Sequence, residues 1–409
     1  MPQHDLLLNP NATPDAAYGR EQAAILNSTG LSEAHNIISA WPGYAPTPLR
    51  DLPGLSANTG VAAIHYKDEN YRFDLKSFKP LGGAYAVARL LMDKLPEMLD
   101  VEKINITELL TGRHSKACSK LTVTAATDGN HGRAVAWSAQ MFGCKCVIFI
   151  NAAVSKGREQ AISDLGAEVR RTSGSFDDAV RISQETADKE NWHVIADTTA
   201  GIFNPSANYV TQGYAVMAAE TIAQLPNGTR PSHMFLQAGV GGMAAATCGQ
   251  FWQAFGPDRP RVIIVEPYNA ACWFESLRFG QPTSITGNID SLMCGLACGE
   301  ISELAWKILK PGAHAAMKVA DKVAANTMCQ LASGVGNDEP IVAGESGVAG
   351  LAGFLSIAEH EDSRRLLEID HTSRIVVFGT EGATDPDTYK HIVELHPDEV
   401  IAGKRSSMT

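Results

Sequence analysis

The sequence predicts an α/β fold of two domains, each built around a twisted, largely parallel sheet covered by helices. Strand-like and helix-like segments alternate along most of the chain, and this order is typical of parallel sheets with helices on their faces. Several strand-like segments, such as 262–265 and 375–378, are apolar throughout, as expected of strands buried on both faces. A chain of 409 residues exceeds what one core usually organises, so two domains are expected.

Runs of apolar and β-branched residues mark the expected strands. These runs are 62–67, 121–126, 146–150, 168–171, 193–196, 233–238, 261–266 and 374–379. Apolar residues at helical spacing predict helices at 84–95, 132–141, 155–165, 176–189, 209–224, 242–254 and 348–357. Residues 90–212 contain a complete set of strand–helix units. We therefore expect a smaller domain over 90–212, inserted into a larger one formed by 1–89 and 213–409.

Charge, hydropathy and cysteine content indicate which partners and which cell compartment to expect. The net charge of −11 argues against a nucleic-acid partner, which would need a basic surface. The chain has no apolar stretch long enough to cross a bilayer and no signal-peptide pattern at its start, so a cytoplasmic protein without membrane contact is expected. The eight cysteines lack zinc-ligand spacing, so no metal site is expected. Whether Cys272 and Cys298 meet in space stays open.

One lysine stands out by its neighbours. Lys79 follows Phe78 and precedes Pro80 and a glycine pair, close to the expected start of a helix. A lysine placed in this way is expected to be partly shielded, and burial or nearby positive charge lowers the pKa of an amine for covalent catalysis on a carbonyl group. Most lysines are solvated surface charges, and by chemistry alone Lys67 and Lys76 compete with Lys79.

Glycine clusters suggest tight backbone turns around a ligand. Residues 127–133 read Thr-Asp-Gly-Asn-His-Gly-Arg between a strand and a helix, where free N–H groups suit a carboxylate, although a plain tight turn has the same pattern. Residues 237–243 read Gln-Ala-Gly-Val-Gly-Gly-Met and suit a phosphate. They also match the first glycines of a dinucleotide fingerprint, with Glu266 at a later strand end, so a nucleotide-dependent dehydrogenase is one alternative.

The lysine segment resembles a known motif. Ser77-Phe78-Lys79 followed by Gly82-Gly83-Ala84 is similar to the lysine motif of the fold-type-II pyridoxal-phosphate (PLP) enzymes, the tryptophan synthase β and threonine dehydratase group. The turn at 127–133 resembles the S-x-G-N-H-G turn of that group, and an aspartate in place of the serine is similar to the diaminopropionate ammonia-lyases. The resemblance spans about residues 43–387 and implies a tryptophan synthase β-like fold with PLP as cofactor.

The resemblance also implies roles for individual residues. Lys79 forms the Schiff base with PLP and moves the Cα proton, and Asp128 is a second acid/base on the opposite face, so that both enantiomers lose their proton. The residues expected at the cofactor are Phe78, Lys79, Asn130 at the phenolic oxygen, Gly239, Val240, Gly241 and Gly242 at the phosphate, and Thr380 at the pyridine nitrogen. Those expected at the substrate are Asp128, Gly129, His131 and, for the distal amino group, Asp197.

The expected reaction is α,β-elimination of 2,3-diaminopropionate to pyruvate and ammonia, by a carbon–nitrogen lyase of amino-acid catabolism. A neutral hydroxyl at the pyridine nitrogen favours elimination over transamination. The relatives are usually homodimers, which implies the same here. Where the family has Trp-Glu-Gly-Tyr, residues 200–203 read Ala-Gly-Ile-Phe. A dehydratase for a β-hydroxy amino acid such as threonine, serine or phenylserine is therefore an alternative, and a PLP-binding protein without catalysis is another.

Overall fold

The computed structural model describes residues 4–127, 129–174, 176–197, 205–226 and 229–404. The chain forms two compact units. The larger unit comprises Met1–Asn27, Pro46–Ser77 and Met217–Thr409, and the smaller one comprises Ser28–Ala45 and Phe78–Val216. The smaller unit therefore begins earlier than the expected residue 90 and also takes in a segment near the N-terminus. A cut at residue 90 would divide helix α4 (Lys79–Leu99), which is one continuous helix.

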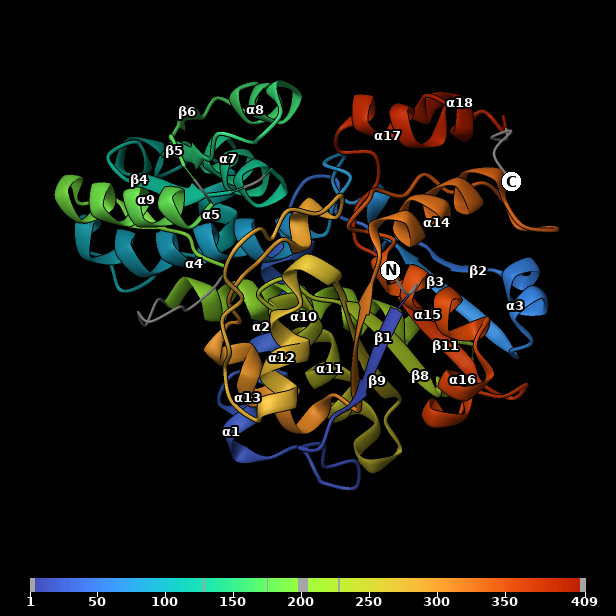
Figure 1. Ribbon diagram of the computed structural model, residues 1–409. Coiled ribbons are helices and arrows are strands. Elements are labelled where there is room, and N and C mark those ends of the chain that lie inside the picture. Colours follow the sequence, from blue (N-terminus) through green and yellow to red (C-terminus); the bar gives the residue numbers. More distant parts are fainter. Residues whose placement is uncertain (1–3, 128, 175, 198–204, 227–228, 405–409) are drawn as a thin grey trace. The chain divides into compact units, whose positions relative to one another are not determined.

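The larger unit contains a seven-stranded sheet with the order β1-β10-β9-β8-β11-β3-β2 (Figure 1). The strands are β1 (His4–Leu8), β2 (Leu49–Asp51), β3 (Ala63–Asp68), β8 (His233–Gln237), β9 (Arg261–Pro267), β10 (Ala315–Val319) and β11 (Arg374–Gly379). The inner pairs are parallel, and only the edge strands β1 and β2 run antiparallel to their neighbours. The α/β class and the apolar parallel strands predicted from the sequence are confirmed.

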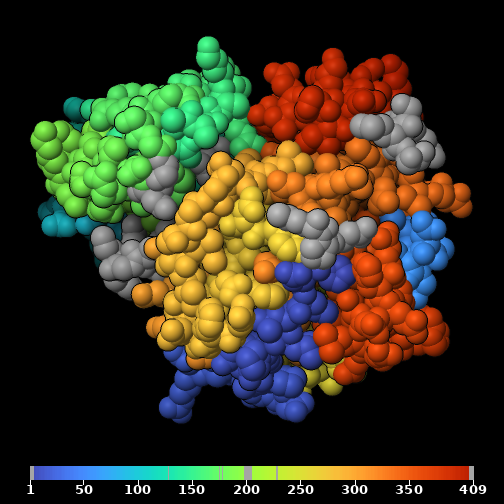
Figure 2. Space-filling model, in the orientation of Figure 1, coloured from blue at the N-terminus to red at the C-terminus, as the bar shows by residue number. Residues whose placement is uncertain are grey.

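Helices and short 3-10 turns complete the larger unit. The helices are α1 (Arg20–Ala23), α3 (Pro53–Thr59), α11 (Gly242–Phe255), α12 (Cys272–Phe279), α13 (Glu303–Gly312), α14 (Asp321–Ser333), α15 (Ala349–Ala358), α16 (Glu361–Leu367), α17 (Pro386–Val393) and α18 (Pro397–Ile401). Helix α15 lies directly on the sheet, because a Cβ atom at Gly350 would stand 2.5 Å from the carbonyl oxygen of Phe235. In Figure 2 the N-terminal segment, coloured blue, lies on the surface of this unit.

The smaller unit holds a four-stranded parallel sheet with the order β6-β5-β4-β7. Its strands are β4 (Thr122–Ala126), β5 (Lys145–Ile150), β6 (Glu168–Arg171) and β7 (His193–Val194). Its helices are α2 (Ser28–Ser39), α4, α5 (Ile106–Leu110), α6 (Ser115–Cys118), α7 (Asn130–Phe142), α8 (Lys156–Ser163), α9 (Phe176–Glu190) and most of α10 (Pro205–Gln224). Each of these strands had been expected within a few residues of its observed position.

The differences from the sequence prediction have local causes. Helix α4 begins at Lys79 instead of residue 84, because Pro80 is compatible with the first helical turn, where its missing N–H has no helical partner. Strands β1, β2 and β10, helices α2, α13 and α14, and the shorter helices α1, α3, α5, α6, α12, α16, α17 and α18 were not predicted. The two edge strands are short and only partly buried, and β10 has the sequence Ala-Ala-Met-Lys-Val, which has little β-branched character.

Three further findings bear on the expected partners. Within the described ranges, no helix combines the length and the apolarity needed to cross a membrane. The same ranges contain no cluster of His, Cys, Asp and Glu that could hold a metal ion. All eight cysteines are free thiols, Cys272 and Cys298 included.

Candidate active site

Lys79 is the first residue of α4, and its amine is held by a carboxylate. The Lys79 Nζ atom donates a hydrogen bond to Asp197 Oδ2 over 2.9 Å, and each side chain is 21% exposed. The rings of Phe78 and Tyr214 lie with their centroids 5.5 and 5.9 Å from Nζ. The amine thus lies beside an anion and two aromatic faces, all of which attract a cation.

The electrostatics of Asp197 follow from this contact. Burial by itself raises the pKa of the Asp197 carboxyl, but the ion pair with Lys79 brings that pKa well below its ordinary value. The carboxylate is therefore ionised at neutral pH and ready to receive an ammonium group. Residues 198–204, which follow Asp197, lie outside the described residues.

Gly82 and Gly83 lie inside helix α4, where they allow close helix packing. The sequence interpretation of glycine clusters as tight turns around a ligand is therefore wrong for this pair. A Cβ atom at Gly82 would stand 2.5 Å from the Tyr214 ring, and one at Gly213 would stand 1.9 Å from the carbonyl oxygen of Leu81. Helices α4 and α10 thus touch backbone to backbone. This close packing brings the ring of Tyr214 to 4.6 Å from that of Phe78, centroid to centroid, beside the amine.

The turn before α7 is organised by Thr127. Its hydroxyl accepts hydrogen bonds from Gly129 N (3.0 Å) and Gly132 N (3.1 Å), in the manner of a helix cap. A Cβ atom at Gly132 would stand 2.4 Å from Thr127 Cγ2, so this position requires glycine. Asn130 is the first, half-buried residue of α7. Asp128, the predicted second acid/base, lies outside the described residues.

His131 is buried beneath this turn. Its Nε2 lies 2.8 Å from the carbonyl oxygen of Ile195, so Nε2 carries the proton because a carbonyl only accepts. Burial lowers the pKa of His131, and the neutral ring packs against Gly83. The side chain therefore braces the segment that follows β7, and its Nδ1 atom is buried without a hydrogen-bond partner among the described residues.

Lys67, the competing lysine, belongs to a buried ion network in the larger unit. Its Nζ donates to Thr47 O (2.8 Å), Glu220 Oε2 (2.8 Å) and Gln224 Oε1 (2.9 Å), which uses all three of its protons. Arg72 binds the same carboxylate of Glu220 at 2.7 Å. The Lys67 side chain is fully buried, so it cannot meet a carbonyl substrate and its role is structural.

Hydrogen bonds to its carbonyl oxygens fix the glycine loop between β8 and α11. The Trp273 Nε1 donates to the carbonyl oxygen of Gly239 over 3.0 Å, and Ser302 N donates to that of Val240 over 2.8 Å. Gly241 has a φ of +100°, and a Cβ atom there would stand 2.2 Å from the Trp273 ring, so glycine is required. Gly242 begins α11, whose first turn has no acidic residue, and such a helix start attracts a phosphate.

Glu266, the candidate ribose ligand of the dehydrogenase alternative, is already in use. Its two carboxyl oxygens accept hydrogen bonds from Trp273 N and Phe274 N at 2.8 Å each, which caps α12. The side chain is fully buried, and burial raises the pKa of Glu266 to about 8. A buried helix cap cannot hold a ribose. The dehydrogenase alternative therefore loses Glu266, and only the glycine pattern of residues 237–243 still supports it.

Thr380, at the end of β11, is 4% exposed and joined to a residue that the sequence analysis did not single out. The Gln237 Nε2 atom at the end of β8 donates to Thr380 Oγ1 over 2.8 Å. Gln237 is a polar side chain in an otherwise apolar, buried strand, directly before the glycine loop. That position was a signal available in the sequence. Tyr214 was missed as well, since nothing local ties it to Lys79.

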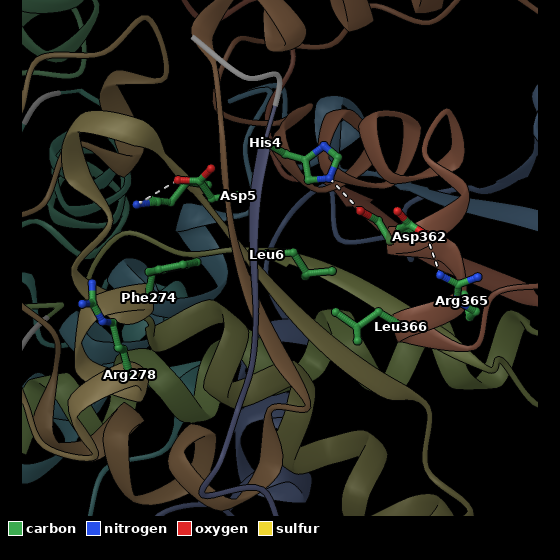
Figure 3. Close-up of a pocket in the computed structure, with 10 residues that line it drawn as sticks. His4, Asp5, Leu6, Phe274, Arg278, Asp362, Arg365 and Leu366 are labelled. Atoms are coloured by element: carbon green, nitrogen blue, oxygen red, sulfur yellow. Dashed lines mark hydrogen bonds and ion pairs between the residues drawn. The ribbon is translucent and has the colours of Figure 1, made fainter.

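A concave region lies on the larger unit, away from Lys79 in the sequence and lined by other residues (Figure 3). This depression of about 880 Å³ lies along β1 and is lined by His4, Asp5, Leu6, Phe274, Arg278, Lys318, Asp362, Ser363, Arg365 and Leu366. Its charges have partners: Lys318 Nζ lies 3.2 Å from Asp5 Oδ2, Arg365 bonds Asp362, and Arg278 Nη1 lies 3.3 Å from Glu275 Oε2. Because these charges are already matched, the depression is not our candidate site.

Comparison with known proteins decides the family. A model of the family described as pyridoxal-phosphate dependent enzyme matches residues 40–380, which is most of the chain. The chain belongs to this family. The diaminopropionate ammonia-lyase of Salmonella typhimurium strain LT2 is 35% identical over 399 residues, covering 95% of this chain and 98% of the relative. The enzyme of the same name from Escherichia coli strain K12 is 38% identical over 380 residues, covering 92% and 94%.

The solved structures agree with the sequence comparisons. The holo diaminopropionate ammonia-lyase from Escherichia coli has a TM-score of 0.86 and 35% identity to this chain, covering 95% of it and 96% of the solved chain. Membership in the PLP enzyme family, the fold expected from the lysine motif and the resemblance to diaminopropionate ammonia-lyases are thus confirmed.

The residues of this PLP enzyme fit its cofactor. An aldehyde needs an amine that is within reach of solvent, and Lys79 is partly exposed. A phosphate needs backbone N–H groups at a helix start with room for close approach, and Gly241 and Gly242 offer them. The ring nitrogen needs a hydrogen-bonding partner, and Thr380 has a buried hydroxyl. PLP is therefore the cofactor whose chemistry these side chains match.

Proposed function

We propose that this protein is a PLP-dependent ammonia-lyase that eliminates ammonia from 2,3-diaminopropionate and releases pyruvate. The observation that carries the proposal is the ion pair of Lys79 and Asp197 in a chain 35–38% identical to diaminopropionate ammonia-lyases. The pair places an amine able to capture an aldehyde next to an anion able to bind an ammonium group.

We assign the cofactor to a defined set of side chains. Lys79 holds it through its amine, Phe78 and Asn130 line the ring, Gly239, Val240, Gly241 and Gly242 take its phosphate, and Thr380 binds its pyridine nitrogen. When bound, PLP supplies an electron-withdrawing ring that stabilises negative charge at the substrate Cα. A hydroxyl in place of a carboxylate at the ring nitrogen supports elimination over transamination.

The chain's own groups move the protons and select the substrate. Lys79 accepts the Cα proton of one enantiomer, and Asp128 accepts that of the other. Gly129 and the backbone of His131 bind the substrate carboxylate at the start of α7, where helix N–H groups favour an anion. Asp197 binds the distal ammonium group, and its contact with an ammonium at 2.9 Å, that of Lys79, supports this role.

Substrate turnover tests the proposal. Purified protein with PLP would be given both enantiomers of 2,3-diaminopropionate, serine, threonine and phenylserine, with ammonia and 2-keto acid measured for each. We expect the highest kcat/KM with 2,3-diaminopropionate, for both enantiomers. The Asp128→Ala variant should lose turnover of one of the two enantiomers. A preference for a β-hydroxy amino acid would refute the proposal.

A β-hydroxy-amino-acid dehydratase is the second candidate, and one observation favours it. Residues 200–203 read Ala-Gly-Ile-Phe, where the lyases have Trp-Glu-Gly-Tyr, although these residues lie outside the described ranges. Keto-acid identity separates the two, since phenylserine gives phenylpyruvate. The cytoplasmic location and the homodimeric state expected from the sequence remain proposals, which cell fractionation and light scattering test.

A further inference from the structure

The side-chain amide of Gln237 has a defined orientation. Its Nε2 atom lies 2.7 Å from Phe378 O, 3.1 Å from Gly347 O and 2.8 Å from Thr380 Oγ1. Carbonyl oxygens only accept hydrogen bonds, so the atom facing both of them must be the amide nitrogen. The opposite rotamer would place an oxygen against two carbonyl oxygens.

The orientation of Gln237 determines that of Thr380. An amide nitrogen donates and does not accept, so the Thr380 hydroxyl accepts in this contact and its own proton must point elsewhere. Among the described residues, that proton meets no protein acceptor. A side chain that is 4% exposed therefore carries an unused donor.

This orientation of the Gln237 amide lowers the stability of the fold, because it leaves one polar atom without a partner. The other amide atom, Gln237 Oε1, is buried without a hydrogen-bond partner among the described residues, and it faces Gly350, where a Cβ atom would stand 2.8 Å away. Buried, unsatisfied oxygens are rare in proteins and call for an explanation. A requirement that Thr380 always donate provides one.

We infer that Gln237 is a positioning residue that locks the Thr380 hydroxyl as a hydrogen-bond donor to the ring nitrogen of PLP. The inference rests on the proposed function, since it deepens the role of Thr380 at that site. The hydroxyl keeps a second lone pair, but accepting from a protonated ring nitrogen would leave its own buried proton without an acceptor, so an unprotonated ring nitrogen is the better partner. Gln237 thus sets the protonation state of the ring through Thr380 without touching the cofactor.

A double-mutant cycle tests this role. Gln237→Met, Thr380→Val and the double variant would be prepared full-length, stripped of cofactor and titrated with PLP. Gln237→Met should weaken PLP binding about fivefold to tenfold where Thr380 is present, as for one hydrogen bond, and less than about twofold in the Thr380→Val background. Equal weakening in both backgrounds would show that Gln237 acts only through the fold and would overturn the inference.

The absorbance of the bound cofactor gives a second readout. In the wild type it should not change across the neutral pH range, because the ring nitrogen stays unprotonated. In Gln237→Met the hydroxyl can turn and accept, so a pH-dependent transition should appear; its absence would contradict the inference. Gln22→Met is the matched control, since Gln22 Nε2 also donates to a backbone carbonyl, that of Lys307, at 2.8 Å. That variant should lose stability and leave PLP affinity unchanged.

The outcomes also separate the inference from the proposed function. A wild-type protein that binds no PLP would refute the proposed function itself. A wild type that binds PLP and turns over 2,3-diaminopropionate, while Gln237→Met shows neither the background-dependent affinity nor the pH transition, would refute the role of Gln237 alone.

Discussion

Lys79 and Asp197 are joined by a hydrogen-bonded ion pair, with 2.9 Å between Nζ and Oδ2, although 118 positions separate them in the chain. The same carboxylate is our proposed partner for the distal ammonium of the substrate. In the proposed reaction, capture of the cofactor by Lys79 would release Asp197 to bind that ammonium, and the pair would connect cofactor capture with substrate selection.

Asp197→Asn should lower kcat/KM for 2,3-diaminopropionate by about 10- to 100-fold, because a hydrogen bond to a charged group is lost. Turnover of serine, whose β-substituent is uncharged, should fall much less. Steady-state kinetics on both substrates measure the difference. The matched control is Asp188→Asn on α9, an exposed aspartate bonded to Gln184, which should change neither. Equal losses on both substrates would argue against a role in binding the leaving group.

The pH dependence of stability should reveal the same carboxylate. Its pKa is lower in the folded protein than in the unfolded chain, where aspartate titrates near about 3.9. Asp197 therefore stabilises the fold above that pH, and the contribution is lost as the pH falls through the folded pKa. Urea unfolding of the cofactor-free protein should give a higher free energy of unfolding for the wild type than for Asp197→Asn at neutral pH. This difference should disappear below about pH 4. A difference that widens on acidification would contradict the ion pair.

Borohydride reduction of the protein with PLP should attach the cofactor to Lys79 and to no other lysine. Peptide mass spectrometry of the reduced, digested protein locates the label. Lys79→Met should abolish the label and cost about 1 kcal/mol of stability at most, because the pair is partly exposed. Lys67→Met should cost about 3–5 kcal/mol, because it leaves Glu220 and its neighbours short of one buried charge. A label on Lys67 would refute our assignment.

Gly213→Ala should destabilise the smaller unit by about 3 kcal/mol, because the new methyl group would overlap the carbonyl oxygen of Leu81. Denaturant unfolding measures the loss. Gly157→Ala on α8 is the control, since its Cβ atom meets nothing closer than Ser155 Oγ at 3.9 Å. That substitution should be neutral or raise stability by up to about 1 kcal/mol, as expected of alanine in a helix. Equal effects would mean that α4 and α10 do not depend on close contact.

Much of the fold could be predicted because its signals are local. A buried parallel strand is apolar along its own length, and a helix repeats its apolar face every three to four residues, so strands such as β8 and β9 and helices such as α9 and α11 were expected within a few residues of their ends. Edge strands are only half-buried and short, so β1 and β2 carried no such pattern.

The sequence by itself determined the fold class, the lysine motif and the two glycine turns, because each is a property of adjacent residues. The family motif already pointed to Lys79, and the tertiary structure showed why Lys67 cannot take its place: the Lys79 amine is partly exposed beside Asp197, whereas Lys67 is a buried cation bound by Glu220. Only the neighbouring positions of β8 and β11 brought Gln237 to Thr380. These contacts join residues more than a hundred positions apart in the chain. They depend on how the strands and helices are arranged in space, and the pattern of a single segment does not predict that arrangement.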